Sequence, residues 1–324
     1  MVINKKKRVK KRAIAMSFNW LFAILAGGFI LFLAIYGTVK IMEGGSNTDN
    51  TETAAKLAGI LDPLGSGLAS GKSASVNFNQ DTKTYYRCES RSKFGDMSIA
   101  FSQRGIGDRY SEKGQFIDTN KYIFAEREIE GKKLYVYSKP FEMGFKIDDL
   151  IVISSKDYCF YQAPNEIKDE VKGLNIENIK LIDNLKNCTG TTVCFGSRTN
   201  CDISVYGMCE NYNCDSKYDY GKVIKNKKEV YYVDSLMYGA IFSSNEIYEC
   251  NIKRLMKRFV ALSSVYMDKI KIIELKGCSS NIETDLTGML AIARTINNSQ
   301  GIYSMSQLTQ TMDAKNSASI CKLY

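Results

Sequence analysis

Cysteine is the residue type with the clearest chemistry in this sequence of 324 residues. All ten cysteines follow residue 87, and five of them crowd into residues 188–214. Thiols pair as disulfides in an oxidising compartment, whereas zinc sites need Cys-x-x-Cys or histidine spacings that are absent here. The sequence therefore predicts a disulfide framework, its connectivity open, formed by Cys88, Cys159, Cys188, Cys194, Cys201, Cys209, Cys214, Cys250, Cys278 and Cys321. Cys321 is expected to pin the carboxyl terminus.

Acidic residues are the next candidates for chemistry, because the chain contains no histidine. That absence removes most catalytic triads and the commonest general base. A carboxylate pair could still hydrolyse a glycosidic bond. The candidates are Asp148, Asp149, Asp183, Glu246 and Glu249, and nothing in the sequence brings them together.

Two kinds of short motif resemble, respectively, a nucleotide-binding P-loop and the catalytic motif of Ser–Lys hydrolases. Gly71-Lys72-Ser73 ends a Gly-rich run, but a P-loop needs its first glycine at position 66, which is Ser. Ser90-Arg-Ser-Lys93 and Ser319-Ile-Cys-Lys322 match Ser-x-x-Lys but lack the companion motifs of Ser–Lys hydrolases. The sequence therefore predicts no catalytic residue, no metal ligand and no cofactor. Asn187 and Asn297 each begin an N-glycosylation sequon.

The amino-terminal segment predicts a membrane helix. Residues 13–39 carry no charge, and the apolar run 18–39 would span roughly 33 Å as a helix, enough for the hydrocarbon core of a bilayer. Trp20 and Tyr36 stand near the ends of this run, where interfacial aromatic residues are favoured.

Charge sets the expected orientation of this helix. Seven basic residues precede it, so the positive-inside rule places the amino terminus in the cytoplasm and the rest of the chain outside. They are Lys5, Lys6, Lys7, Arg8, Lys10, Lys11 and Arg12. The formal net charge is +9, but residues 43–324 hold 36 basic and 35 acidic residues. This near-neutral body argues against a nucleic-acid partner.

An alternative is a leader of the type IV pilin kind. Arg12-Ala13-Ile14-Ala15 resembles the archaeal pilin-type cleavage signal, and cleavage after Ala13 would leave the apolar helix to pack into a filament core. A cleaved secretory signal is disfavoured because the apolar run is long and no Ala-x-Ala site follows it.

The outer part divides by pattern into strands followed by helices. Residues 44–53 are small and polar and predict a tether, followed by a short helix over 53–61 that Pro63 ends. Alternating or β-branched patterns predict strands at 97–102, 121–125, 133–138, 141–148, 150–154, 158–161, 178–182 and 230–233. Helices are expected at 164–172, from a cap at Ser244 to about 270, at 286–296 and at 303–313.

One cluster of basic residues falls on the first of the long helices. Lys253, Arg254, Lys257 and Arg258 are expected on a solvated face, with an acidic partner or lipid headgroups as the alternative. The predicted organisation is a cytoplasmic tail at 1–12, a transmembrane helix at 13–42, a juxtamembrane segment at 43–75, a strand-rich ectodomain at 76–234 and a helical part at 235–324 packed on it.

Three stretches of the chain carry a family resemblance. They are Ser17-Phe-Asn-Trp-Leu-Phe-Ala-Ile, Tyr135-Val-Tyr-Ser-Lys-Pro-Phe-Glu-Met143 and Ile247-Tyr-Glu-Cys-Asn-Ile-Lys-Arg-Leu-Met-Lys-Arg258. They resemble an uncharacterised family of single-pass archaeal membrane proteins, and the resemblance covers most of the chain. It implies an amino-terminal anchor and a cysteine-containing ectodomain. It implies no catalytic residue, because the family has no assigned activity.

The sequence thus predicts an α+β protein with an amino-terminal transmembrane helix, a strand-rich, disulfide-braced ectodomain and a helical carboxyl-terminal third. The leading hypothesis for function is a membrane-anchored surface or envelope protein that works through structure or interactions. Its expected partners are the lipid bilayer, other surface proteins and a second copy of the chain. A pilin-like filament subunit and an extracytoplasmic hydrolase that uses carboxylates remain the alternatives.

Overall fold

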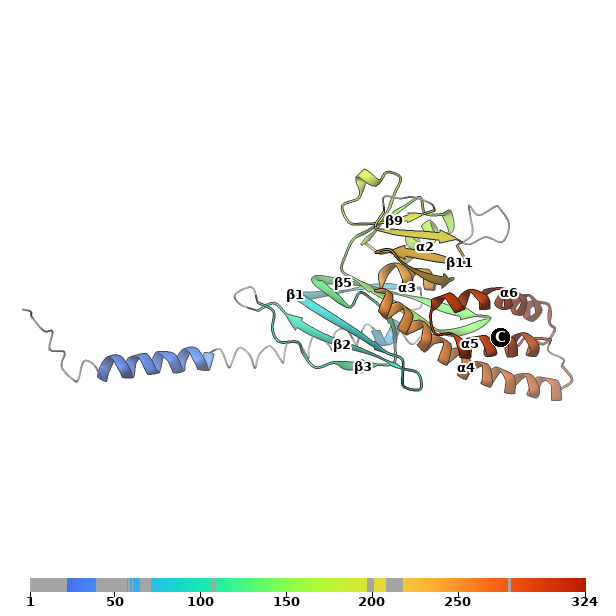
Figure 1. Cartoon of the computed structure of the whole chain (residues 1–324), viewed down its shortest axis with the longest axis horizontal. Helices are drawn as coiled ribbons and strands as arrows, with labels where there is room; N and C mark the ends of the chain where they lie inside the picture. The colour runs from blue at the N-terminus through green and yellow to red at the C-terminus, as the bar shows by residue number, and fades with distance from the viewer. Residues whose placement is uncertain are drawn as a thin grey trace, which may run out of the picture. The chain divides into compact units, whose positions relative to one another are not determined.

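The computed structural model describes residues 22–38, 57, 59, 61–64, 71–105, 109–196, 201–207, 218–278 and 281–324 (Figure 1). The chain divides into two units, residues 1–49 and 50–324. The predicted tether at 44–53, the basic residues 5–12 and the possible cleavage site at Ala13 lie outside the described residues.

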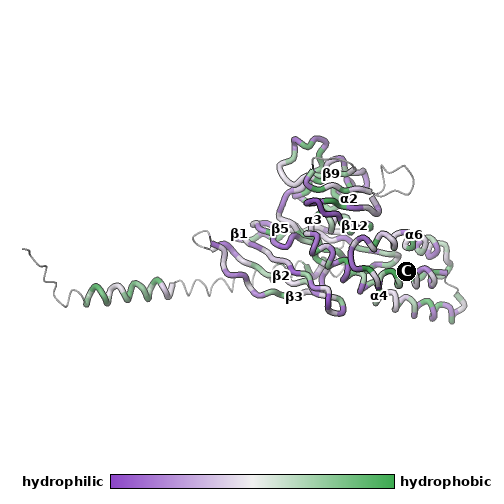
Figure 2. The backbone as a smooth tube through the Cα atoms, in the orientation of Figure 1, coloured by the Kyte–Doolittle hydropathy of each residue, from purple (hydrophilic) through white to green (hydrophobic). Residues whose placement is uncertain are grey.

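In the first unit, residues 22–38 form a helix whose large apolar side chains are exposed, and it is mostly hydrophobic along its length (Figure 2). Tyr36 lies near its end and stacks on Phe32, with ring centroids 6.2 Å apart. Trp20 and residues 18–21 and 39 of the predicted span lie outside the described residues. Within the described ranges, no helix combines the length and the apolar character that crossing a bilayer requires.

The second unit, called the body below, is an α+β fold with two six-stranded mixed sheets. In the first sheet all neighbouring pairs are antiparallel except β4 and β6, which are parallel. Its order is β3 (Ile117–Thr119), β2 (Asp96–Gln103), β1 (Ser73–Glu89), β5 (Glu128–Met143), β6 (Phe145–Ser154) and β4 (Tyr122–Phe124).

In the first sheet, β4, β5 and β6 are buried on both faces, whereas β1 and β2 pack only into the smaller of two cores. The alternation of side chains along each strand assigns each residue to a face. In β6, Leu150 and Val152 join the larger hydrophobic core with the second sheet and the long helices. Ile151 and Ile153 point to the other face, where a smaller core includes Leu57. The described residues 57, 59 and 61–64 are helical, and they include Pro63, where the short helix was predicted to have ended.

The second sheet has parallel and antiparallel pairs. Its order is β12 (Lys228–Val233), β11 (Tyr220–Lys225), β10 (Ile203–Gly207), β9 (Thr191–Phe195), β7 (Tyr158–Tyr161) and β8 (Ile179–Ile182). The helix α2 (Asn165–Leu174) follows β7 and leads to β8, which lies parallel to it. This is the helical crossover that parallel neighbours require.

Helices fill the carboxyl-terminal third, as predicted. They are α3 (Leu236–Phe242), α4 (Asn245–Leu275), α5 (Glu283–Thr295) and α6 (Tyr303–Ala318), and the last three gather at one end of the body (Figure 1). Ser244 caps α4 as expected, because its hydroxyl accepts a hydrogen bond from the Ile247 amide at 3.4 Å.

One predicted strand is wrong in its length. The alternation over residues 141–148 predicts a single strand, but the chain reverses at Gly144 and pairs Met143 with Phe145. Gly144 has φ of +80°, a conformation that disfavours other residues, so the hairpin turn fits there and nowhere else in this run. The alternation survives the reversal because both arms bury the same face.

The disulfide framework is confirmed in part. Among the described residues, Cys88 pairs with Cys250, Cys159 with Cys188, Cys194 with Cys201, and Cys278 with Cys321. The last pair fixes the carboxyl terminus, as expected for Cys321. Cys209 and Cys214 lie outside the described residues.

The expectation of a solvated basic face on α4 is wrong. Lys257 donates to the carbonyl oxygens of Ser90 and Ser92, and Arg258 pairs with Asp148 at 2.9 Å. Arg254 has no exposed surface. Its guanidinium lies over the ring of Tyr122 and donates to Phe94, Gly95, Asn120, Lys121 and Asn251. These three cations hold α4 against the first sheet, Arg254 and Lys257 through its loops and Arg258 through β6.

Replacing Arg254 with alanine should lower the free energy of unfolding by about 3–5 kcal/mol, because four backbone carbonyls and one amide oxygen lose a buried donor. Arg254→Lys should lose less but remain destabilised, since an ammonium cannot reproduce the planar fork of donors. Chemical denaturation measures the loss. Lys253→Ala, on the same helix, is the control and should change stability by less than about 0.5 kcal/mol. Equal losses for Arg254→Ala and Lys253→Ala would contradict the assignment.

Candidate functional site

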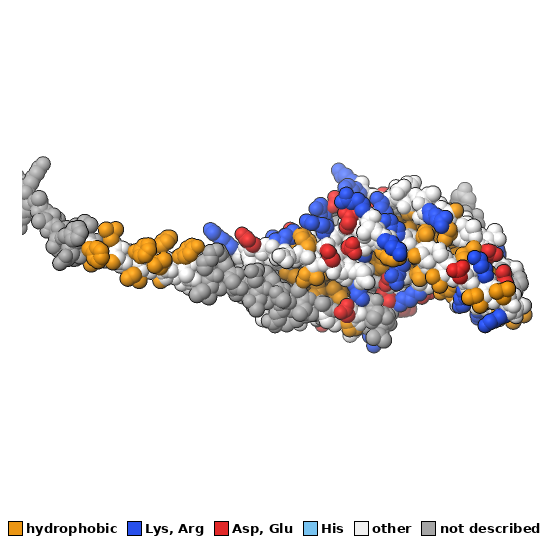
Figure 3. Space-filling view, turned by 90° about the horizontal axis from the view of Figure 1, so that it is seen from below, with side chains coloured by type: hydrophobic (Ala, Val, Ile, Leu, Met, Phe, Trp, Pro, Cys, Tyr) orange, Lys and Arg blue, Asp and Glu red, His pale blue; other side chains and the backbone are white. Residues whose placement is uncertain are grey.

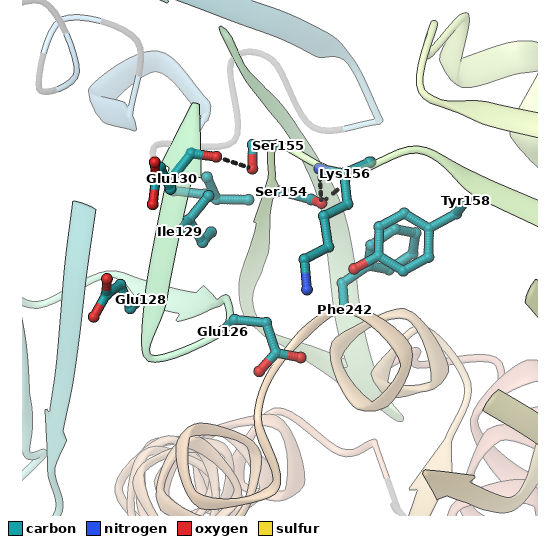
Figure 4. Close-up of a pocket in the computed structure, with 10 residues that line it drawn as sticks. Glu126, Glu128, Ile129, Glu130, Ser154, Ser155, Lys156, Tyr158 and Phe242 are labelled. Carbon is teal, nitrogen blue, oxygen red and sulfur yellow. Dashed lines mark hydrogen bonds between the residues drawn. The ribbon is translucent and has the colours of Figure 1, made fainter. Parts of the chain in front are cut away.

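A pocket of about 290 Å³ lies where the first sheet passes into the second, and it is called the seam pocket here. Its walls come from the start of β5, the end of β6, the turn that follows and the first residue of β7 (Figure 4). Phe242, the last residue of α3, closes one side. The pocket therefore lies at the short connection between β6, which ends at Ser154, and β7, which begins at Tyr158.

Glu126 is anchored at the seam pocket by a buried lysine. The ammonium of Lys225 lies 3.1 Å from the Glu126 carboxylate, and it also donates to the carbonyl oxygens of Ile241 and Ser243. The Lys225 side chain is only 7% exposed. Burial lowers the pKa of Lys225, while the Glu126 carboxylate acts in the opposite direction. This ion pair fixes the position of a carboxylate that keeps about a third of its surface accessible.

Lys156 and Tyr158 complete the polar lining. The Lys156 side chain extends into the pocket toward Glu126, and the Tyr158 ring stands beside it (Figure 4). Burial raises the pKa of Tyr158 to about 12, so the phenol stays protonated at neutral pH and can donate a hydrogen bond. A carboxylate, an ammonium and a phenol thus share one pocket with the apolar side chains of Ile129 and Phe242.

The remaining glutamates of the pocket face away from its centre. Glu128 and Glu130 point apart from Glu126 (Figure 4), and Lys83 pairs with them at 2.9 and 3.5 Å. Among the described residues, no three acidic or cysteine side chains come together as metal ligands would.

The two serines of the pocket are engaged with the backbone. The Ser154 hydroxyl accepts from the Lys156 amide at 3.1 Å, and the Ser155 hydroxyl donates to the Glu130 carbonyl at 2.8 Å. Ser154 also hydrogen-bonds to the Tyr158 phenol, but among the described residues neither serine hydroxyl is hydrogen-bonded to a carboxylate or amine that could take its proton, which nucleophilic catalysis requires. The lining is suited to holding a polar molecule by charge and hydrogen bonds.

The structure does not bring the predicted carboxylates together. Asp148 pairs with Arg258, Asp149 with Lys146 at 2.7 Å, and Glu246 with Arg127 at 2.9 Å. Glu249 accepts hydrogen bonds from the amide and the hydroxyl of Ser299, which fixes the start of a short 3₁₀ helix. Asp183 lies exposed after β8. The alternation over residues 141–148 would place Asp148 on the solvent face of its strand, but its side chain is only 17% exposed and is ion-paired with Arg258.

The other short motifs have structural roles where they are described. Residues 65–70 lie outside the described residues, and Ser73 opens β1 with its hydroxyl donating to the Leu174 carbonyl at 2.6 Å. Ser90 accepts from Lys257 through its carbonyl, and Ser319 donates to the Cys321 carbonyl at 3.1 Å. Asn187 and Asn297 are exposed, but Ser299 of the second sequon is buried.

The sequence signals did not single out Glu126, Lys156 or Lys225. These residues are up to 99 positions apart, and no motif contains them. A signal existed for Lys225 alone, because it ends a strand pattern on the side where Val223 is buried. A lysine on a buried face needs a partner.

No known protein-family model, curated protein or solved structure matches this chain.

Proposed function

We propose that this protein is anchored in the cell membrane by its amino-terminal helix and displays a disulfide-braced body on the outer side, where it acts by binding. The single observation that carries the proposal is the pairing of cysteines throughout the body. Eight of them form four disulfides, in sheets, loops and the carboxyl terminus alike. Such pairing is stable outside the cytosol and rare within it.

Binding is favoured over catalysis by how the polar side chains are used. The carboxylates that could have formed a hydrolytic pair are engaged in separate structural contacts. The seam pocket offers Glu126, Lys156 and Tyr158 for recognition, and its serines are bound to the backbone. Acidic and basic side chains are interspersed over the face of the body seen in Figure 3, which suits selective contacts with surface partners.

Topology and thiol state together test this proposal. The full chain, produced in cells with its amino-terminal segment, should resist alkylation by a membrane-permeant maleimide until a reductant is added. Protease added to intact cells should remove the body, and mass analysis should find chains that still begin before Ile14.

Each departure from this result has a distinct meaning. Thiols that react before reduction, or a body protected in intact cells and cleaved only after lysis, would overturn the outer location. Surface chains that all begin at Ile14 would replace the anchor with the filament-subunit alternative. A variant lacking the seven basic residues at 5–12 is the control for orientation, because it should lose its uniform topology.

A further inference from the structure

A second pocket of about 370 Å³ opens beside the first turn of α4, and it is called the basic groove here. Its side chains come from four separate parts of the body. Tyr85 and Arg87 belong to β1, Lys113 and Phe116 to the segment before β3, and Arg127 and Glu246 to the starts of β5 and α4. The groove is distinct from the seam pocket, although Glu128 lines both.

The walls of the basic groove are held in place. Cys88 lines it and is bonded to Cys250 in α4, so β1 and α4 are joined covalently at the groove. The segment that carries Lys113 is hydrogen-bonded to β2. The amides of Ser111 and Gly114 donate to the carbonyl oxygens of Gln103 and Phe101, each at 2.8 Å. A ligand therefore meets a preformed site, which lowers the ordering cost of binding.

The charges in the groove do not cancel. Glu128 pairs with Lys83, and Glu246 pairs with Arg127, both at 2.9 Å. Within the described part of the chain, Arg87 and Lys113 form no ion pair with a carboxylate, and both make cation–π contacts with aromatic rings. Two positive charges thus remain uncompensated, and the start of the 31-residue helix α4 adds to the positive potential.

Aromatic rings position these two cations. The Arg87 guanidinium lies 4.3 Å from the centre of the Phe116 ring, and the Lys113 ammonium lies 3.6 Å from the centre of the Tyr85 ring. The ring of Phe116 also lies 5.0 Å from Lys113 and so links the pair. Cation–π contact leaves the N–H donors at the edge of each cation free for an anion.

We propose that the basic groove binds an acidic carbohydrate, with Arg87 and Lys113 holding its carboxylate. Arginine matches a carboxylate with two parallel hydrogen bonds, and the lysine adds a point charge. The volume lies at the small end of the range for small-molecule pockets, which suits a short stretch of sugar rings better than a folded partner. The choice of a carbohydrate rests on the proposed outer location, while the binding of an anion rests on the groove alone.

The test titrates the full chain, held in detergent micelles, with a short oligogalacturonate and with its methyl ester. The two probes share their shape and differ in charge. Calorimetry should show binding of the acid that weakens at high salt, and binding of the ester weaker by about tenfold or more. The double variant Arg87→Gln, Lys113→Gln should lose affinity for the acid by a similar factor. The matched control Lys132→Gln removes an exposed lysine outside the groove and should bind as the native chain does.

Three outcomes would overturn the proposal. They are equal affinity for acid and ester, unchanged affinity in the double variant, and stronger binding of a glutamate-rich peptide than of the sugar. Circular dichroism of each variant confirms that it is folded, so a loss of binding reports on the groove. If binding fails while the cysteines are found oxidised at the cell surface, this inference is wrong and the proposed function stands.

Discussion

Raising the pH above about 10 is expected to unfold the body cooperatively, because its buried tyrosines must ionise on unfolding. Seven tyrosines among the described residues are at most 3% exposed, and burial shifts the pKa furthest in five of them, namely Tyr86, Tyr137, Tyr232, Tyr238 and Tyr248. Burial raises the pKa of each phenol well above its ordinary value of 10. In the folded body they therefore stay protonated where an unfolded chain would lose the protons.

The direction in which stability changes with pH follows from the number of protons that the folded and unfolded states bind. Below pH 10 both states hold these protons, so the stabilisation is fully present, and it is lost as the pH rises because only the unfolded chain releases them. One pH unit above 10, each tyrosine removes about 1.4 kcal/mol, and the five together about 7 kcal/mol. Lys225 acts oppositely, since its lowered pKa makes stability rise with pH below 10.5, but it is a single group.

Tyrosinate absorbance and far-ultraviolet circular dichroism should change together in an alkaline titration. Tyr86 and Tyr137 are the best positions for a test variant, because their buried hydroxyls have no hydrogen-bond partner among the residues that the structure describes. Replacing both with phenylalanine should leave stability at neutral pH unchanged or higher, and it should move the alkaline transition upward. Tyr206→Phe, at a partly exposed position, is the control and should move nothing. Tyrosinate absorbance that develops fully before the loss of helical signal would contradict the prediction.

Removing the disulfide between Cys88 and Cys250 should lower the free energy of unfolding by about 5 kcal/mol. These cysteines are 162 residues apart, so their bond restricts the unfolded chain more than any other disulfide among the described residues. The bond also joins β1 to α4, and Arg254 of α4 donates to the Phe94 carbonyl in the loop that follows β1. The double variant Cys88→Ala, Cys250→Ala leaves no unpaired thiol from this bond.

The matched control removes Cys194 and Cys201, which are only seven residues apart. Its loss should be about 2 kcal/mol, since a short loop restricts the unfolded chain less. Guanidinium denaturation followed by tyrosine fluorescence measures both, and it reports on the body because the single tryptophan, Trp20, precedes it. Equal losses in the two variants would show that loop length does not set the stabilisation.

Local patterns in the sequence determined most of the elements of the body. The alternation of Met97, Ile99 and Phe101 predicted β2, and the cap at Ser244 with its helical repeat predicted α4. These predictions succeed because the period of the apolar residues and the capping chemistry depend on neighbours along the chain. The long strand β1 was missed, since polar residues on one face and a bulge between Asn77 and Thr82 interrupt its pattern.

Only the tertiary structure decided which residues from distant parts of the chain lie next to one another. The order of the strands determines that Cys88 meets Cys250, that Arg254 is buried under loops of the first sheet, and that Glu126, Lys156 and Lys225 meet at the seam pocket. These residues carry no local signal, because their partners lie tens to more than a hundred residues away and only the packing of two sheets brings them together. The sequence by itself determined an uncharged amino-terminal run, a near-neutral body rich in cysteine and the types of its elements. Only the packing of the chain determines which charged side chains are buried in structural contacts and which, such as Arg87 and Lys113, line the groove proposed to bind a ligand.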